Sequence, residues 1–520
     1  MSWSSSFDRP LHLNGLILRC IVPLVFACGV IPTDIGEDQT TKPNIVIILT
    51  DDMGYADLGC MDSEISTPHI DQIASNGLLF THCYNASRCC PSRASLLTGL
   101  YQHAAGVGFM VADYGTPAYQ GFLNDRCLTI AEALSPRGYA TNMSGKWHLG
   151  GHIEQWPDRR GFERFYGLPD GGGVYYYPYK FRDRPLFKNG EPTEVDTTSF
   201  YCTDDFTTAA IEFIDQSHSE DKPFFLYLAH IAPHFPLQAW PEDINKYKDM
   251  YDDGYAAIRA SRFTKQKQLG IVQKDIDLSP LDYADWSTVD TASEAFKMAV
   301  YAAQVDRLDQ NTGRLTTHLQ SLNILANTLI FFLSDNGASA EEINESPQGE
   351  VGTRYCFESH GKSWANVSNT PFMKYKKYEH EGRIITPLII HWPRGISTEN
   401  RLVHAPVHII DIMPTILDIA EVQYPAEQQG KMLLPLDGRS FLPLLKGNEL
   451  QDEAPLFWEH RGNKAVRSGS YKLVNVHNDD WELYDLSIDP VESNDISYVN
   501  TGLVDSLQNL WNGWAQAKGV

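Results

Sequence analysis

Four short apolar runs, rich in β-branched residues, most constrain what this chain can fold into. They lie at residues 44–50, 224–229, 329–333 and 388–391. A continuous apolar run is typical of a strand buried on both faces, as in a parallel sheet. Between these runs, apolar residues recur at helical spacing, as in residues 70–76, 128–134 and 294–319. Strands that alternate with helices predict an α/β fold, with a large, mostly parallel central sheet flanked by helices.

The C-terminal part has a different pattern. Residues 465–467, 471–474 and 481–484 are short alternating segments, separated by turn residues. Such segments are typical of antiparallel hairpins. We therefore expect a large domain over residues 44–450 and a small α+β subdomain with an antiparallel sheet over residues 451–520.

The N-terminal segment is typical of an export signal. Arg9 and Arg19 precede an apolar run at residues 20–32, and a polar stretch follows. The run is too short for an ordinary membrane span, and no other run is long enough. We expect an export signal over residues 1–28 and a polar tether over residues 29–43. Residues 25–28 have the shape of a lipoprotein cleavage site, so an exported chain could be secreted, periplasmic, or an outer-membrane lipoprotein with its lipid on Cys28. The alternative to export is a mis-called start codon or a buried N-terminal helix.

The net charge of the chain limits the classes of partner that it can bind. The formal net charge is −24. Such a chain is a poor ligand for nucleic acid and repels anions at long range. We therefore expect no nucleic-acid partner, and an anion site must be built locally from a metal and a few cations. The nine cysteines include no C-x-x-C spacing, and their disulfide pairing stays open.

Acidic clusters follow two of the predicted strands directly. Asp51 and Asp52 follow the first run, and Asp335 and Asn336 follow the run at 329–333. In open α/β sheets, sites form outside the carboxyl ends of the strands. Carboxylate and amide oxygens are ligands that calcium or magnesium prefers. Two such clusters favour a metal site over a pair of Asp-rich turns.

A helix start lies between these clusters. Pro91 suits a first helical turn, so Cys89 is predicted at a helix N-terminus, where the dipole and free N–H groups favour an anion. Arg93 follows one turn later and can reach the same anion. The alternative is that Cys89 and Cys90 are a vicinal pair packed in the core.

The segment from Cys89 to Arg93, with Leu97-Thr98-Gly99 after it, resembles the C-x-P-S-R and L-T-G signature of the type I sulfatases, in the alkaline phosphatase superfamily. The resemblance runs from Asn44 to the region of Asp495 and is strongest to bacterial arylsulfatases, through residues 119–124 and 161–164. It implies an alkaline-phosphatase-like sheet and hydrolysis of sulfate esters. It also implies one Ca²⁺ per chain and a maturation enzyme that converts Cys89 to formylglycine. The substrate would be a sulfated small molecule or a sulfated glycan.

The same resemblance identifies further site residues. Lys146 and His148 match the G-K-W-H-x-G motif, His234 matches A-P-H-x-P, and Lys376 matches a late lysine, with Lys374 and Lys377 as alternatives. The implied calcium ligands are Asp51, Asp52, Asp335, Asn336 and the modified Cys89. The chain departs from the family pattern at Arg383, where the family has the second glycine of E-G-G.

Roles follow from the resemblance. The hydrated aldehyde at position 89 attacks sulfur, with Asp335 as base. Arg93, Lys146 and Lys376 hold the sulfate oxygens, His234 serves the leaving group, and His148 serves the second step. The alternatives are a phosphate or phosphonate monoester hydrolase, a sulfamidase, and a catalytically silent sulfoglycan-binding relative.

Substrate choice is predicted to lie in the loops at residues 109–121, 171–188 and 238–278. Their aromatic residues suit stacking on an aryl group or a sugar ring, or ordinary packing. The residues concerned are Tyr175, Tyr176, Tyr177 and Trp240.

Overall fold

The computed structural model describes residues 42–176, 184–346, 349–376, 378–396, 402–451, 453–477 and 479–520. The predicted signal, Cys28, Tyr177 and Lys377 lie outside these residues. No helix in the described part of the chain is long and apolar enough to cross a membrane. The described cysteines, seven in number, are all free thiols.

A mixed sheet forms the centre of the fold. Among the described residues it has 11 strands in the order β10-β2-β9-β8-β1-β7-β3-β4-β5-β6, with β11 beside β2. The strands are β1 Asn44–Asp51, β2 Leu78–Tyr84, β3 Ala140–Lys146, β4 Arg164–Leu168, β5 Phe187–Lys188, β6 Glu191–Pro192, β7 Phe224–Pro233, β8 Thr328–Ser334, β9 Ile385–His391, β10 Leu402–Val403 and β11 Val407–His408. The predicted mostly parallel sheet is confirmed: β1 runs parallel to β7 and β8, and β3 runs parallel to β7 and β4.

Strand β9 is the exception in the centre of the sheet, since it runs antiparallel to both β8 and β2. Its sequence is as apolar and as buried as that of β1. An apolar run reports burial on both faces and carries no information on strand direction.

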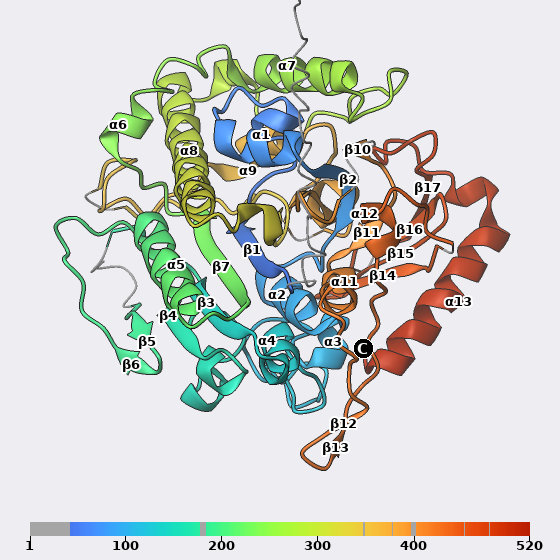
Figure 1. Ribbon diagram of the computed structural model, residues 1–520. Coiled ribbons are helices and arrows are strands. Elements are labelled where there is room, and N and C mark those ends of the chain that lie inside the picture. Colours follow the sequence, from blue (N-terminus) through green and yellow to red (C-terminus); the bar gives the residue numbers. More distant parts are fainter. Residues whose placement is uncertain are drawn as a thin grey trace, which may run out of the picture. The chain divides into compact units, whose positions relative to one another are not determined.

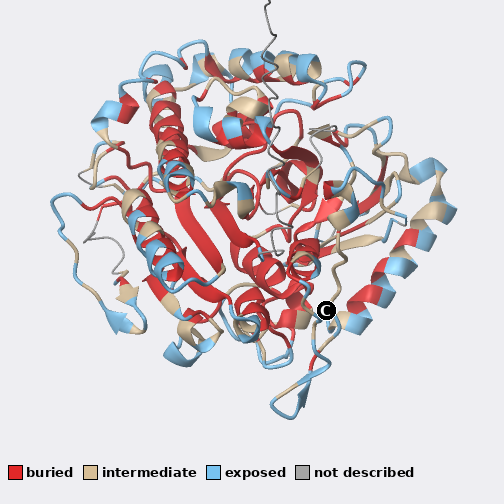
Figure 2. Cartoon of the chain, in the orientation of Figure 1, coloured by how far each residue is buried: buried red, intermediate tan, exposed pale blue. Residues whose placement is uncertain are grey.

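Helices cover both faces of the sheet (Figure 1). The side chains of Val46 and Ile48 belong to one apolar cluster, with residues of α1 (Pro68–Ser75), α5 (Cys202–Ser219) and α8 (Thr291–Ser321). The intervening Ile45, Ile47 and Leu49 belong to a second cluster, with residues of α2 (Cys89–Thr98), α4 (Ile130–Leu134) and α11 (Ile412–Ile419). Successive side chains of a strand point to opposite faces, so β1 is buried between two helical layers. Figure 2 shows the central strands buried and the outer faces of the helices exposed.

The longest helix, α8, and the helix that carries Cys89, α2, lie in different layers. The helices are α1 Pro68–Ser75, α2 Cys89–Thr98, α3 Gln102–Ala105, α4 Ile130–Leu134, α5 Cys202–Ser219, α6 Pro241–Ile244, α7 Gly254–Leu269, α8 Thr291–Ser321, α9 Gly361–Ser368, α10 Glu381–Ile384, α11 Ile412–Ile419, α12 Leu442–Leu445 and α13 Thr501–Lys518. Helix α4 begins at a capping box, in which Thr129 and Glu132 bond each other's backbone N–H groups.

A second sheet is antiparallel, as predicted for the C-terminal part. It consists of β14 Leu456–His460, β15 Asn463–Ser468, β16 Tyr471–Asn475 and β17 Trp481–Asp485, in that order. Helix α13 packs Trp511 and Trp514 against the same apolar cluster as Val466 and Leu473. A two-stranded ribbon, β12 Glu427–Gln428 and β13 Lys431–Met432, precedes this sheet.

The two sheets are joined close to α2. The Trp458 indole N–H donates to the Asn85 carbonyl at 2.7 Å. The buried Lys472 ammonium pairs with Glu381 at 2.6 Å and with Glu492 at 2.8 Å. The C-terminal sheet therefore contacts both the segment that leads into Cys89 and helix α10.

Candidate active site

The two predicted acidic clusters meet at the carboxyl ends of β1 and β8. Thr50 pairs with Ser334 in the parallel ladder, so the residues that follow are neighbours. The Asp52 N–H donates to Asp335 Oδ1 at 3.2 Å, and Asn336 Nδ2 donates to Asp52 Oδ1 at 2.5 Å. Asp52 has φ 62°, a left-handed conformation that turns its side chain back into the site.

Four cationic or basic side chains surround these oxygens. Arg93 donates to Asp335 Oδ2 through Nε at 3.0 Å and through Nη2 at 2.9 Å. The Lys146 ammonium, at the end of β3, donates to Asp51 Oδ2. Lys376 Nζ donates to Asp52 Oδ2 at 2.7 Å, and His234 Nε2 lies 3.4 Å from the same oxygen. Burial favours a neutral amine, yet Asp51 holds the pKa of Lys146 above its ordinary value.

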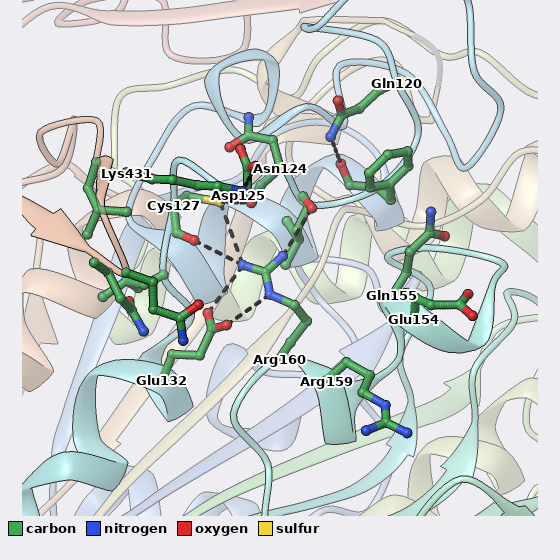
Figure 3. Close-up of a pocket in the computed structure, with 16 residues that line it drawn as sticks. Gln120, Asn124, Asp125, Cys127, Glu132, Glu154, Gln155, Arg159, Arg160 and Lys431 are labelled. Carbon is green, nitrogen blue, oxygen red and sulfur yellow. Dashed lines mark hydrogen bonds and ion pairs between the residues drawn. The ribbon is translucent and has the colours of Figure 1, made fainter.

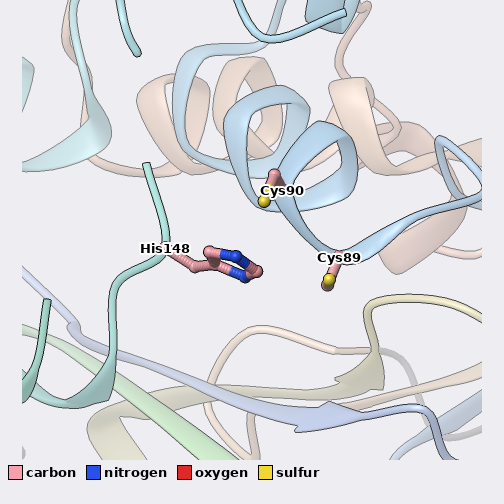
Figure 4. A group of neighbouring side chains, drawn as sticks. All are labelled: Cys89, Cys90 and His148. Atoms are coloured by element: carbon pink, nitrogen blue, oxygen red, sulfur yellow. The ribbon is translucent and has the colours of Figure 1, made fainter. Parts of the chain in front are cut away.

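Cys89 is the first residue of α2, as predicted, and its thiol lies beside Cys90 and His148 (Figure 4). The two sulfurs and a ring nitrogen of His148 lie within 4.8 Å of one another. A hydrogen bond from Cys90, followed by the charges of Lys146 and His148, holds the pKa of the Cys89 thiol well below its ordinary range, although burial opposes this. The site therefore stabilises negative charge at position 89.

The two histidines occupy different sides of the site. His148 lies with the cysteines, while a ring nitrogen of His234 lies within 4.8 Å of carboxylate oxygens of Asp51 and Asp52. His234 Nδ1 lies 2.6 Å from the Phe235 carbonyl oxygen, so Nδ1 carries a proton and Nε2 faces the site. The Tyr175 hydroxyl donates to the His234 carbonyl at 2.7 Å and supports this turn.

The donor set fits a hard divalent cation. Asp51 Oδ1 and Asn336 Oδ1 are buried and accept no hydrogen bond from any described residue. A buried oxygen without a donor is costly, and a cation relieves that cost. With Asp52 and Asp335, these side chains supply the oxygen ligands that calcium prefers.

The structure brings every residue predicted for the site into one cluster. Lys376 reaches Asp52, whereas the Lys374 ammonium lies over the Tyr378 ring, 5.3 Å from its centroid. Sequence reasoning did not predict Arg88, whose Nη2 donates to Glu341 at 3.3 Å beside the site. The position of Arg88 directly before Cys89 in the sequence is the signal from which it could have been predicted.

The loop aromatics are packing residues. Tyr175 and Tyr176 are buried, with their rings 5.4 Å and 5.2 Å from that of Tyr201. Trp240 packs edge-on against Tyr176 at 5.1 Å. Of the two interpretations left open, ordinary packing therefore describes these three residues.

A polar groove of about 640 Å³ lies beside the loop at residues 119–124 (Figure 3). At its centre, Arg160 donates to both oxygens of Glu132 and to the Leu123 and Cys127 carbonyls. All of the guanidinium's polar atoms are used within the protein, so Arg160 holds the groove together. None of the residues predicted for the site lines this groove.

A buried cation site ringed by Arg, Lys and His, at the carboxyl edge of a parallel sheet, defines a hydrolase of anionic esters. Residues 43–422 match the Sulfatase family, and residues 372–514 match the family described as "N-sulphoglucosamine sulphohydrolase, C-terminal". The chain belongs to the sulfatase family, within the alkaline phosphatase superfamily, and is a sulfuric ester hydrolase.

Relatives cover nearly the whole chain. An uncharacterized sulfatase of Schizosaccharomyces pombe is 34% identical, over 93% of this chain and 95% of its own. An arylsulfatase of Klebsiella aerogenes is 31% identical, over 82% of this chain and 96% of its own. The dog N-acetylgalactosamine-6-sulfatase is 28% identical, over 88% of this chain and 77% of its own. Among solved structures, that of Ps i-CgsB is similar with a TM-score of 0.70 and 27% identity, over 91% of this chain and 93% of its own.

Proposed function

We propose that this sulfatase acts through a formylglycine made from Cys89 and one calcium ion, and that its substrate is a sulfated sugar. The observation that carries the proposal is the position of Cys89. It lies at the N-terminus of α2, with His148 beside it and Lys146 acting on its charge. A nucleophile at this point faces the oxygen-rich cation site.

Asp51, Asp52, Asp335 and Asn336 would hold the calcium, which would polarise the sulfate, and the hydrated aldehyde at position 89 would supply a hydroxyl as the nucleophile. The residues of the chain do the rest. Asp335 accepts the proton of that hydroxyl. Arg93, Lys146 and Lys376 donate hydrogen bonds to the sulfate oxygens and stabilise the charge that develops there.

The histidines divide the proton transfers. His234 presents Nε2 to the site, so it is placed to give a proton to the leaving oxygen. His148 lies beside position 89 and accepts the proton of the second hydroxyl as sulfate departs. Their separation, one with the cysteines and one with the aspartates, supports this division.

The support for a sugar substrate comes from the relatives, because the loop residues Tyr175, Tyr176 and Trp240 are used for packing. One relative is named for a sulfated sugar, and Ps i-CgsB has been crystallised with k-i-k-neocarrahexaose. We further propose export through the signal at residues 1–28, with Cys28 as the alternative lipid site. Residues 44–450 would then be the catalytic domain and residues 451–520 its subdomain.

The maturation of Cys89 tests the proposal. Trypsin should release the peptide from Cys89 to Arg93, and its mass should show an aldehyde at position 89 when the host contains a maturation enzyme. Hydrolysis of 4-nitrophenyl sulfate should rise with the fraction converted and be absent in Cys89→Ala. Cys90→Ala should still carry the aldehyde. Full activity with unmodified Cys89 would contradict the mechanism, and faster hydrolysis of a phenyl phosphonate would favour the phosphonate hydrolase.

A further inference from the structure

Arg383, in α10, is a buried guanidinium without a hydrogen-bond partner. Its exposed fraction is 0%, and Nε, Nη1 and Nη2 all lack a partner among the described residues. Burying a charged group in this way costs folding free energy, so each case calls for an explanation. The family pattern has a glycine here, so the fold itself has no need of this side chain.

Helix α10 lies directly beside the catalytic cluster. The Gly337 N–H, next to the metal ligand Asn336, donates to the Arg383 carbonyl at 2.9 Å. On the other side, the Asn85 N–H donates to the Ile384 carbonyl at 2.8 Å. The segment from Asn85 leads into Cys89, so α10 is held between the metal-ligand turn and the start of α2.

Other polar groups around Arg383 also lack partners in the described part of the chain. Arg88 uses Nη2 for Glu341, while its Nε and Nη1 are buried and unpartnered. His460, at the end of β14, has an exposed fraction of 0% and no partner for either ring nitrogen. Burial, and then the charges of Arg383 and Arg88, lower the pKa of His460 well below its ordinary value. We call Arg88, Arg383 and His460 the Arg383 cluster.

Glu379, the carboxyl group that acts most on the charge of Arg383, does not neutralise this cluster. Glu379 accepts a hydrogen bond from the Ser87 hydroxyl through Oε1 at 2.9 Å, while its Oε2 is unpartnered. Burial raises the pKa of Glu379 to about 8, so this side chain is largely neutral at neutral pH. Burial lowers the pKa of Arg383 to about 10, so the guanidinium is still a cation at neutral pH.

Two neighbouring guanidinium groups repel each other unless an anion lies between them. Arginine recognises carboxylate and sulfate through two parallel hydrogen bonds, which a lysine cannot supply. Cys89 marks the position of the sulfate that is cleaved, and Arg88, a member of the Arg383 cluster, directly precedes it in the chain. A substrate that reaches both must carry two negative groups on the same or adjacent sugar rings.

We propose that Arg383, together with Arg88 and His460, forms a subsite for a second anionic substituent of the sugar, a sulfate or a carboxylate, next to the sulfate that is hydrolysed. The inference rests on the proposed sugar sulfatase function. It makes the second anion a requirement for tight binding and assigns the C-terminal sheet, through His460, a part in substrate choice.

The test replaces Arg383 with methionine, which has similar bulk and no charge. The kcat/KM values are measured for a sugar with one sulfate, a disulfated sugar and a sulfated disaccharide with a uronate carboxylate. The ratio of each dianionic substrate to the monosulfated sugar should fall about 10- to 100-fold in Arg383→Met, as expected for loss of a charge-assisted bidentate contact. The ratio for Arg383→Lys should lie between that of the wild type and that of Arg383→Met. Arg137→Met, at an exposed position, should leave the ratio unchanged.

The two dianionic substrates distinguish the second sulfate from the carboxylate, since the ratio falls for the one that the subsite binds. Equal losses on all substrates, or no loss, would show a pocket filled by water only and overturn the proposal. Thermal unfolding separates binding from folding. Removing an unpaired buried charge should leave the Tm of Arg383→Met at or above that of the wild type, whereas a structural arginine would lower it.

A binding measurement tests the subsite separately from the catalytic activity. Calorimetric titration of the disulfated sugar should show weaker binding to Arg383→Met than to the wild type. If the wild type hydrolyses no sulfate ester, the proposed function fails while this titration still decides the subsite. If the wild type hydrolyses the monosulfated sugar and the titration shows no difference, the subsite alone fails.

Discussion

Replacing Gly171 with alanine tests whether His148 must keep its position for turnover. A Cβ at position 171 would lie 1.9 Å from Nε2, 2.1 Å from Cε1 and 2.4 Å from Cδ2 of the His148 ring. Carbon–nitrogen contacts are favourable near 3.5 Å, so the ring must move by about 1.5 Å. His148 has φ 61°, and its N–H donates to the Pro169 carbonyl at 3.0 Å, so its backbone has little freedom to follow. The imidazole must therefore leave its present position beside Cys89.

The expected loss follows from the size of that displacement. Misplacing a reacting group by about 1 Å can cost ~100-fold in rate, and a positioned acid or base contributes ~10²–10⁴-fold. We expect kcat on 4-nitrophenyl sulfate to fall about 100- to 1000-fold in Gly171→Ala. Gly151→Ala is the matched control, because a Cβ there meets nothing within 4 Å.

A double variant makes the cause specific. If Gly171→Ala acts through His148, adding it to His148→Ala should cost little more, because residues that act as a unit are not additive. Additive losses would refute the reasoning, as would a kcat for Gly171→Ala within about threefold of Gly151→Ala, given the ~10²-fold expectation. The aldehyde content of each variant is measured by mass, so that a failure of maturation is not mistaken for a failure of His148.

Three further outcomes are expected. Chelation should abolish turnover and added Ca²⁺ should restore it, because Asp51 and Asn336 present buried oxygens without donors; full activity in the stripped enzyme would contradict the metal site. The loss of kcat in His234→Ala should be largest for poor leaving groups such as sugar alkoxides and smallest for activated phenols. Equal losses of kcat across phenols of different pKa would contradict a role of His234 at the leaving group. Asp309 accepts a hydrogen bond from the Ile70 N–H at 2.7 Å, and burial raises its pKa to about 7. Because the folded pKa lies above the unfolded value of about 3.9, this carboxyl lowers stability progressively as pH rises from about 4 to about 7. The free energy of unfolding of Asp309→Asn, measured with urea, should therefore rise relative to that of the wild type by up to about 4 kcal/mol between about pH 4 and about pH 7. A difference between the two proteins that is the same at these two pH values would contradict this assignment.

The central fold was predictable because burial on both faces leaves a direct mark on composition. The runs that became β1, β7 and β8 show no alternation of apolar and polar residues that would mark an outer face. The polar pairs Asp51-Asp52 and Asp335-Asn336 mark where β1 and β8 end. The direction of β9 was not predictable, since it depends on which neighbour the strand pairs with. The late lysine was ambiguous for a similar reason. Lys374 and Lys376 differ in the direction that the turn gives each side chain, and Lys374 has φ 66°.

The Arg383 cluster shows what a sequence cannot reveal about specificity. The pattern marks Arg383 as a departure, yet a departure has two physical outcomes: a guanidinium satisfied by neighbouring carbonyls, or one left for a ligand. Arg160 is an example of the first, since it bonds Glu132 and two carbonyls at the polar groove. Arg383 is an example of the second, with three unpartnered nitrogens. Arg88 and His460, from segments far apart in the sequence, interact electrostatically with Arg383 only in the folded chain. The net charge of −24 means that the chain repels a dianionic sugar at long range. Selection of such a sugar must therefore come from short-range contacts with buried guanidinium groups such as that of Arg383.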